Sequence, residues 1–579
     1  MNRSVGLPVL AVCTLLMFSG LQINSDKKVS TLEEFDQAVK SARPGDKIVM
    51  AAGRWRDVEL VFEGHGTKAQ PITLTAEKEG EVIISGLSNL SLAGEYLIVS
   101  GLVFKNGRTP TGEVISFQKN KNAVANHCTV KQCVIDNYNN PERFEPDLWV
   151  SMYGKHNSFE YNSLIDKRNQ GVTLAVRLDT ENSRENFHRI ANNYFGPRDN
   201  LGSNGGETIR IGTSHFSLSN SNTIVENNYF DRCNGEHETI SNKSGNNIYR
   251  GNVFYECVGT LTLRHGKYTL VENNYFLGNG VLNTGGIRVI NEYQTVRYNY
   301  LSGLTGFRFR GALVVMNGIY NSPINRYNQV VDSKIENNLV INCDYIQLCA
   351  GSDDERTAVP VGTSFSNNVF MSNTNKNPFT IYDDISGITF KNNFINEDAT
   401  LPIQTGFEKV KFGISKNQFG LEVPDKKLLK KIGFDKVQLP ITQEQAGASY
   451  YPKVGKRKTF GGGKIIPVIP GTNTILSAMA SAQPGDVLLL QNAGEYLFTK
   501  DCKINKPISI KSHAGEKAII RSSRAGFFQI ENEGSLELVN VNLDGAESPD
   551  QAGNYVISTS KYSMNKNYKL FIRDCSITD

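Results

Sequence analysis

Short runs of β-branched and aromatic residues, separated by turns rich in Asn and Gly, dominate this chain. Clear examples are Thr223–Val225, Tyr268–Val271 and Thr295–Arg297. Helical periodicity is rare, and the runs follow one another too closely to leave room for helices between them. The pattern therefore predicts an all-β protein with many turns.

A recurring unit, in which an Asn precedes an aromatic or aliphatic pair, marks an internal repeat. Its Asn occupies positions 193, 228, 252, 274, 299, 338, 368 and 393, and the commonest spacing is 22–25 residues. Such a period with occasional loop insertions is typical of a solenoid. A right-handed parallel β-helix fits best, with apolar residues stacked inside and Asn stacked at corners, where it tolerates left-handed backbone. Leucine-rich repeats fit less well because the leucine framework is missing.

A second repeat of longer range predicts two domains. The segment Ala38–Asp46 recurs as Ala478–Asp486, and each copy suggests a capping helix, a Pro-Gly-Asp turn and the first β-helix strands. We expect the main β-helix over 25–453, a Lys- and Gly-rich linker over 454–463, and a second partial β-helix over 464–579. Because the second copy ends after a few turns, we expect either a truncated record or an unusually short domain.

The N-terminus has the features of an export signal, predicted over 1–24. Arg3 precedes an apolar stretch, Leu7–Phe18, which is shorter than the roughly 20 residues of a membrane span. We therefore expect a secreted or periplasmic protein without a membrane span after signal removal. The cysteines form no CxxC pair and are expected as buried small residues, with a Cys343–Cys349 bridge as the alternative.

The charge balance argues against a nucleic-acid partner. The net charge is only +4 in 579 residues, and no Lys/Arg-rich run occurs. Candidate chemistry must therefore come from particular groups of residues.

The densest such group is Glu236-His237-Glu238, followed by Lys243. On a strand, positions i and i+2 face the same side, so the two carboxylates would project together and repel unless a cation separates them. Hard oxygen ligands suit Ca²⁺. Asn204, about one coil earlier, would add an oxygen, and Glu207 is a weaker candidate. The alternative is an ordinary exposed Glu-x-Glu strand.

About one coil after Lys243 lie Arg264 and His265. The 21-residue spacing from Lys243 to Arg264 would make these two cations stacked neighbours. A lysine beside a guanidinium and a metal ion is a better base, because neighbouring positive charge disfavours its ammonium form. His265 would either orient a partner or pack in the core. A base next to a cation suits β-elimination in a uronic-acid polymer, where the carboxylate charge must be suppressed before the C5 proton can leave.

At these residues the chain resembles polysaccharide lyase family 6, which includes alginate lyases and chondroitinase B. The matching segments are Asn204–Arg210, Asn234–Ser244, Leu263–Gly266, Gly285–Val289, Gly306–Leu313 and Met316–Gly318. The resemblance implies a calcium site at Asn204, Glu236 and Glu238, with Lys243 as base and Arg264 as the acid. It also makes Arg288, Arg308 and Arg310 candidates for binding the anionic chain, since a guanidinium fork suits carboxylates and sulfates. Because arginine holds its proton tightly, His265, a tyrosine or water are alternative proton donors.

Three functions remain open from the sequence. The first is alginate lyase, which the resemblance favours. The second is a lyase of dermatan-type glycosaminoglycans, which would use the same catalytic set. The third is a non-catalytic glycan-binding β-helix, against which the complete set of candidate catalytic residues argues. The second domain lacks counterparts of these residues and is expected to be non-catalytic. Whether it narrows the groove, binds sugar or supports a homodimer stays open.

Overall fold

The computed structural model describes residues 26–578, apart from 456–458, 492, 514, 516, 561–563 and 565–567. The predicted signal peptide over 1–24 and part of the predicted linker thus lie outside the described residues. In the part of the chain that is described, no helix is long and apolar enough to cross a membrane.

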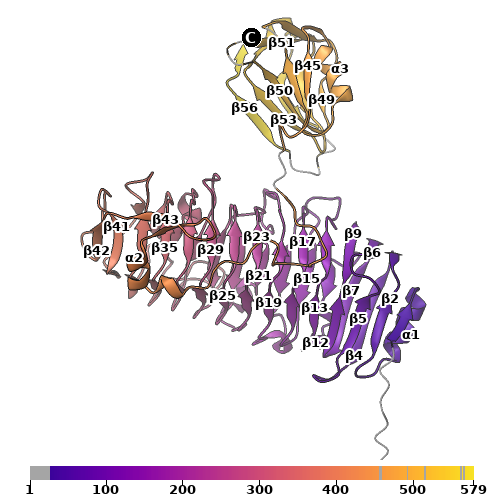
Figure 1. Cartoon of the computed structure of the whole chain (residues 1–579), viewed down its shortest axis with the longest axis vertical. Coiled ribbons are helices and arrows are strands. Elements are labelled where there is room, and N and C mark those ends of the chain that lie inside the picture. The colour runs from indigo at the N-terminus through magenta and orange to yellow at the C-terminus, as the bar shows by residue number, and fades with distance from the viewer. Residues whose placement is uncertain are drawn as a thin grey trace, which may run out of the picture.

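Three long sheets of fourteen strands each form the main body of the molecule (Figure 1). The first sheet runs from β1 (Asp26–Val29) to β40 (Ile388–Lys391), and the second from β3 (Gly53–Arg56) to β42 (Phe407–Val410). The third ends at β39 (Phe379–Ile381) and includes β21 (Ile209–Ile211), β24 (Glu238–Lys243), β27 (Thr260–His265), β30 (Ile287–Val289) and β33 (Leu313–Met316). The chain visits the sheets in turn and, apart from a short antiparallel hairpin formed by β11 (Gln118–Asn120) and β12 (Ala123–Asn126), pairs its strands in parallel with those of the coil before. This is the predicted parallel β-helix.

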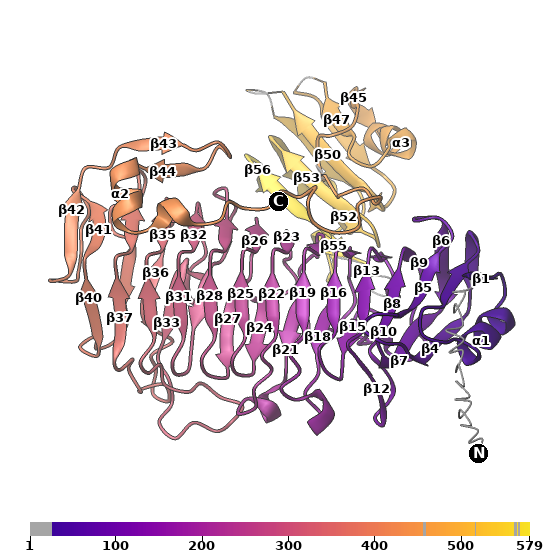
Figure 2. The same cartoon turned by 60° about the horizontal axis from the view of Figure 1, so that its bottom comes forward.

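The helix α1 (Leu32–Lys40) closes the first coil, as expected from the sequence repeat. Thr31 caps it by accepting a hydrogen bond from the Glu34 amide, and Phe35 is fully buried. At the other end of the main body, β41 (Asn393–Asn396) pairs with β42. The strands of successive coils lie side by side between these ends (Figure 2).

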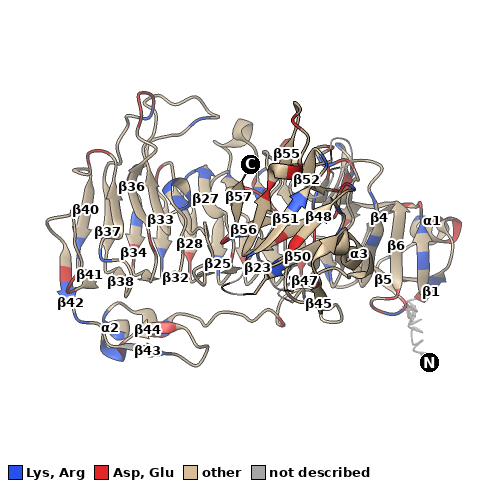
Figure 3. Ribbon diagram, turned by 90° about the horizontal axis from the view of Figure 1, so that it is seen from above, with Lys and Arg blue, Asp and Glu red and all other residues tan. Residues whose placement is uncertain are grey.

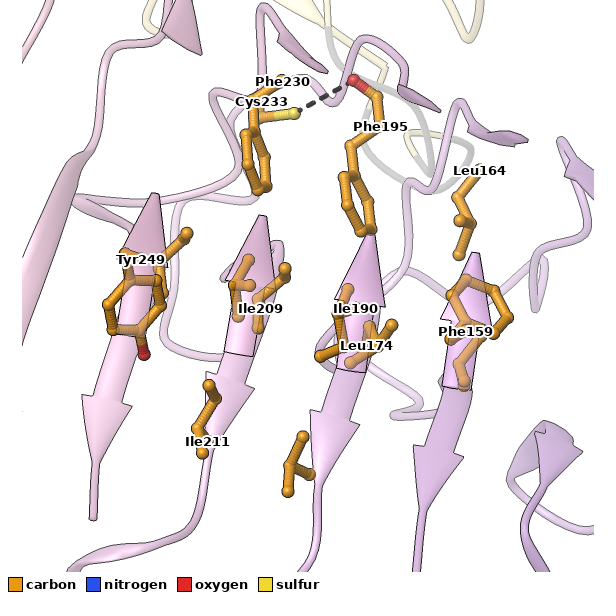
Figure 4. Packing of buried hydrophobic residues seen from close by; sticks show 14 of the residues in the cluster. Phe159, Leu164, Leu174, Ile190, Phe195, Ile209, Ile211, Phe230, Cys233 and Tyr249 are labelled. Carbon is orange, nitrogen blue, oxygen red and sulfur yellow. Dashed lines mark hydrogen bonds between the residues drawn. The ribbon is translucent and has the colours of Figure 1, made fainter. Parts of the chain in front are cut away.

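Apolar side chains stack in register inside the solenoid. Figure 4 shows this packing for Phe195 and Phe230, whose rings are parallel with centroids 4.9 Å apart. Cys233 lies in the same interior and its thiol donates to the Phe195 carbonyl at 3.4 Å (Figure 4). All eight cysteines of the described chain are free, so the alternative Cys343–Cys349 bridge is wrong: both thiols are buried as small apolar groups.

The repeating Asn forms a continuous buried ladder at the corner between the first and second sheets. Asn252 is representative: its amide nitrogen donates to the Val225 carbonyl and to Asn274 Oδ1, both at 2.9 Å. Its own Oδ1 accepts from the backbone and side-chain nitrogens of Asn228, each at 3.0 Å. The residue before each ladder position takes the left-handed conformation; in most coils it is Asn, such as Asn227 with φ 52°, and it is Gly251 or Tyr298 in two others.

A segment that the sequence did not suggest runs back along the second sheet. It contains β43 (Ile414–Lys416), β44 (Glu422–Pro424) and α2 (Lys426–Lys431), which lie beside the main body (Figure 2). Its apolar residues pack against a row of tyrosines on the second sheet. Tyr275 donates to the Gln438 carbonyl at 3.0 Å, and Tyr300 to the Glu422 carbonyl at 2.9 Å. The segment thus shields an aromatic face that would otherwise lie in water.

Residues from β45 (Ile465–Val468) onward form the second β-helix unit with its own buried core. Its three parallel sheets contain five, five and three strands, and α3 (Thr474–Ser481) occupies the predicted capping position. The fold class predicted from the sequence is therefore confirmed for both units.

Candidate active site

A cleft of about 710 Å³ lies over the middle of the third sheet. Its floor is the outer face of β21, β24, β27 and β30, and Arg210, Ser241, Thr262 and Arg288 follow one another across it in register. One wall comes from loops entering the third sheet, including 196–208, 232–237 and 303–312. The other comes from the loop after β33, which contributes Tyr327. Basic and acidic residues are dispersed along the solenoid rather than separated into blocks (Figure 3).

The cleft brings together nine of the ten site residues predicted from sequence. These are Asn204, Glu207, Glu236, Glu238, Lys243, Arg264, Arg288, Arg308 and Arg310. The tenth, His265, does not line it. These residues come from five successive coils, so parallel stacking converts their separation in sequence into proximity.

Glu236 and Glu238 share the cleft, but not for the reason inferred from sequence. The strand β24 begins at Glu238, and Glu236 lies in the bend before it, so the two are not alternate residues of one strand. Glu236 accepts hydrogen bonds from the amides of Gly205 and Gly206 at 2.9 and 3.0 Å. Two main-chain donors from the preceding coil therefore fix its carboxylate.

Negative charge accumulates at this end of the cleft. Burial, and after it the nearby Glu207 carboxylate, raises the pKa of Glu236 to about 7. The Oε2 atom of Glu207 is buried and has no hydrogen-bond partner among the described residues. Glu238 is already paired, because its carboxylate accepts from Arg288 and from the Ser241 hydroxyl.

This donor set fits a hard cation such as Ca²⁺, which prefers carboxylate and amide oxygens. However, no group of three or more His, Cys, Asp or Glu side chains in the described chain is arranged to hold a metal ion by itself. A cation here would therefore depend on an oxygen of Asn204 beside the carboxylates. Asn204 is exposed at the edge of the cleft, and its main-chain carbonyl accepts a hydrogen bond from the Gln170 side-chain amide at 2.9 Å.

Lys243 and Arg264 lie on adjacent strands, as the spacing predicted, but a β-bulge shifts the register. The Cα partner of Lys243 is His265, so Arg264 is displaced along β27. The Lys243 ammonium makes no hydrogen bond or ion pair to another described residue and lines the cleft. Burial lowers the pKa of the Arg264 guanidinium, which lies 3.9 Å from the centroid of the Tyr327 ring.

His265 points into the solenoid and is fully buried. Its Nε2 lies 3.2 Å from the Ser214 hydroxyl, and burial, followed by the charges of Arg264 and Lys243, lowers its pKa to about 3. The imidazole is therefore uncharged near pH 7. It lies beneath the strands that form the floor of the cleft and does not line the cleft itself.

The three arginines proposed for substrate differ in their surroundings. Arg288 is 5% exposed in its side chain and paired with Glu238. Arg310 lies within 3.3 Å of the Asn283 side-chain oxygen, and Arg308 is exposed on the short 3-10 helix η3 (Arg308–Arg310). Arg308 and Arg310 are thus more accessible to a ligand than Arg288.

Sequence reasoning missed several lining residues, namely Arg210, Asn283, Phe307, Phe309 and Tyr327. Tyr327 lies in a loop without repeat signature, and only the tertiary fold brings it over Arg264. The guanidinium of Arg356 also lies 5.4 Å from the Tyr327 ring centroid, so the ring is held between two cations.

A further residue missed from the sequence supports the loop that carries Asn204 and Glu207. The side chain of Arg198 is buried, and burial lowers its pKa to about 10. Its guanidinium donates to the Thr173 hydroxyl and to the carbonyls of Glu207, Asn169, Gly171 and Gly205, at 3.1, 2.9, 3.2, 2.9 and 3.1 Å. It thereby ties three segments together directly beneath the carboxylates.

Comparison with known proteins identifies the family. A family model described as chondroitinase B matches residues 29–436. The solved structure of the PL6 family alginate lyase AlyGC is 52% identical, covers 96% of this chain and 76% of its own, and superposes with a TM-score of 0.87. The chain belongs to polysaccharide lyase family 6.

Solved structures of other members of this lyase family are also similar to this chain, at lower sequence identity. A mannuronic acid specific family 6 lyase from human gut microbiota is 30% identical over 74% of this chain and 96% of its own, with a TM-score of 0.64. A PL6 alginate lyase in complex with a trisaccharide, at 24% identity and a TM-score of 0.62, covers 74% of this chain and 96% of its own and supports the fold alone. No curated protein matches the sequence. The chain is therefore a polysaccharide lyase built on a parallel β-helix.

Proposed function

We propose that this family 6 lyase cleaves alginate by β-elimination, with Lys243 as the base and calcium assistance. The observation that carries the proposal is that the Lys243 side chain has no hydrogen-bond or ion-pair partner among the described residues and lines a cleft that contains both carboxylates and arginines. The substrate assignment is supported by the 52% identical AlyGC, which is an alginate lyase, and by the 30% identical mannuronic acid specific lyase.

Asn204, Glu236 and Glu238, with Glu207 as a weaker member, would hold the calcium ion. When bound, the ion supplies positive charge that lowers the cost of enolate-like charge on a uronate carboxylate. The backbone amides of Gly205 and Gly206 keep Glu236 oriented for this role.

The bond changes follow from the cleft residues. The amine nitrogen of Lys243 takes the C5 proton of the uronate, the electron pair forms the C4–C5 double bond, and the C4–oxygen bond to the neighbouring sugar breaks. Arg264 stabilises negative charge on the departing oxygen, which takes up a proton from water to become the hydroxyl of the released sugar. The ring of Tyr327 lies 3.9 Å from the Arg264 guanidinium and holds it in place. Arg308 and Arg310 bind carboxylates of the flanking sugars. His265 acts as a support beneath β27 rather than as the proton donor.

A dermatan-type glycosaminoglycan is the second candidate substrate, favoured by the match to the chondroitinase B family model. The catalytic set would be the same, because both polymers contain 4-linked uronates. The two candidates differ in sulfate and amide groups, which the arginines would also bind.

The decisive assay is ultraviolet absorbance of the new C4–C5 double bond, with alginate and dermatan sulfate offered separately in the presence of calcium. We expect signal with alginate and a loss of at least about 10³-fold in kcat for Lys243→Ala, a typical upper range for removing a general base. Lys267→Ala is a matched control, since Lys267 lies nearby but pairs with Glu292 outside the cleft. If neither polymer gives a signal, the lyase activity is refuted. Full turnover by Lys243→Ala would refute the role of Lys243 as base. Full activity after removal of calcium by a chelator would refute the calcium role.

A further inference from the structure

A second hollow, of about 640 Å³, lies N-terminal to the cleft at the same corner, where the chain passes from the second to the third sheet. Three arginines line it: Arg56 at the end of β3, Arg108 at the end of β9 (Leu102–Arg108), and Arg168 just after β17 (Ser163–Ile165). The second sheet orders these strands β3-β6-β9-β14-β17, so neighbouring arginines are two strands apart. At about 4.8 Å per strand, this is a row of cations spaced by roughly 10 Å along the solenoid axis. We call it the arginine corner.

The arginine corner has an excess of positive charge. Its lining contains a single carboxylate, Asp57, which already accepts from the Leu87 amide at 2.7 Å and from Arg56 at 3.1 Å. The Arg108 side chain makes no hydrogen bond or ion pair to another described residue. Arg56 pairs with Asp57 and is 70% exposed in its side chain, whereas Arg168 pairs with Asp166 and is 27% exposed. The three arginines therefore exceed the two carboxylates by one positive charge, that of Arg108. At least one complete guanidinium fork is therefore available to an incoming carboxylate.

The remaining lining suits a sugar rather than a simple anion. Asn106 lines the same hollow and brings a side-chain amide, which can pair with hydroxyl groups, whereas the Asn139 amide is already bonded to Asn137, Asp166 and Arg168. Leu87, another lining residue, is an apolar side chain that is 46% exposed, and such a surface packs against the face of a sugar ring. Guanidinium groups, an amide and an apolar surface together match a carboxylate-bearing polysaccharide.

The same coils form another hollow on the face of the third sheet, and its charge is opposite to that of the arginine corner. That hollow, of about 500 Å³, is lined by Glu59 and Glu113, and its one lysine, Lys119, is already paired with Glu63 at 2.7 Å. A polyanion would be repelled there. Of the two hollows N-terminal to the cleft, charge therefore favours the arginine corner.

The arginine corner is also structurally joined to the cleft. The turn that follows Arg168 hydrogen-bonds to the loop at the cleft edge: Gln170 donates to the Asn204 carbonyl, and the Gly171 amide to the Gly205 carbonyl, both at 2.9 Å. One coil separates the two surfaces, so one polymer chain can reach both.

We propose that the arginine corner is a secondary binding site for the uronate polymer, which it holds outside the cleft while another part of the chain is cleaved. This inference rests on the proposed uronate lyase function. It predicts that the site contributes to binding long chains and contributes nothing to short ones that fill only the cleft.

The test is the double variant Arg56→Ala/Arg108→Ala in the full chain, with Arg43→Ala/Arg54→Ala as control. The control removes the same charge from exposed positions outside the hollow. With polymeric alginate we expect KM to rise about fivefold or more in the first variant, the size expected for losing about one net charge-assisted contact, with kcat unchanged. With trisaccharide-sized substrates, KM should match the wild type. An unchanged KM on polymer, or an equal rise on short substrates or in the control, overturns the proposal.

Binding without turnover separates this proposal from the lyase assignment. The arginine substitutions are repeated in the Lys243→Ala background, and retardation in gels containing alginate or dermatan sulfate is measured. We expect weaker retardation in the alginate gel only when Arg56 and Arg108 are replaced. If the wild type forms no double bond yet this difference persists, the lyase proposal fails and the binding site stands. If turnover is normal and retardation does not change, the binding site fails alone.

Discussion

Replacing Arg198 by lysine tests how the cleft carboxylates are held in place. Lysine keeps the positive charge, but its three donors radiate from one atom and cannot span the five acceptors that the guanidinium reaches. The carbonyls of Glu207 and Gly205 also accept main-chain amides, whereas those of Asn169 and Gly171 have Arg198 as their only donor within the described chain.

The magnitude follows from these two carbonyls. A buried acceptor left without a donor costs about 1–3 kcal/mol, so Arg198→Lys should lower the free energy of unfolding by about 2–4 kcal/mol after lysine recovers part of the loss. Denaturant unfolding of the full chain measures this. Arg189→Lys is the control, because Arg189 pairs with Glu160 and Glu226 on a half-exposed surface and should cost less than about 1 kcal/mol.

The functional consequence should appear in the calcium dependence. A looser loop holds Gly205 and Gly206 less firmly against Glu236, so kcat/KM should fall at limiting calcium and recover in part when calcium is raised. If the substitution only destabilised the fold, activity measured below the unfolding temperature would fall by the same factor at every calcium concentration. Wild-type stability together with an unaltered calcium dependence would refute the reasoning.

Three further predictions concern the ladder, a buried histidine and the cleft tyrosine. Asn252→Ala removes four buried hydrogen bonds of the Asn ladder and should cost about 2–5 kcal/mol in thermal or chemical unfolding, whereas the exposed Asn122→Ala should change stability by less than about 0.5 kcal/mol; equal effects would contradict the ladder's role. Burial lowers the pKa of His188 from its ordinary value of 6.5 to about 3. Between pH 6.5 and about 3 this histidine therefore binds a proton in the unfolded chain but stays unprotonated in the folded chain. Stability should therefore be lost as pH falls from 6.5 towards 3, by about 2 kcal/mol at pH 5, and His188→Gln should flatten this dependence in unfolding experiments; an unchanged slope would count against it. Tyr327→Phe should retain most of kcat while Tyr327→Ala loses at least about fivefold, if the ring holds Arg264; a large loss in the phenylalanine variant would instead make the phenol hydroxyl the proton donor.

The sequence by itself determined the architecture of this protein and most of the candidate site. Stacking of like residues is a local, periodic requirement, so the Asn at each coil and the short apolar runs were enough to predict the parallel β-helix. The same period placed Asn204, Glu236, Lys243 and Arg264 on neighbouring coils, because parallel pairing turns one repeat length into one strand spacing.

Only the tertiary structure decided the parts that do not follow the period. The bulge between β24 and β27 sets His265 beneath the floor and displaces Arg264, and no spacing in the sequence distinguishes these two positions. Tyr327 reaches the cleft from an irregular loop, and Arg198 acts through carbonyl groups that every residue possesses. Periodic contacts can be read from side-chain identity, whereas loop closure and main-chain hydrogen bonding depend on how the whole chain folds.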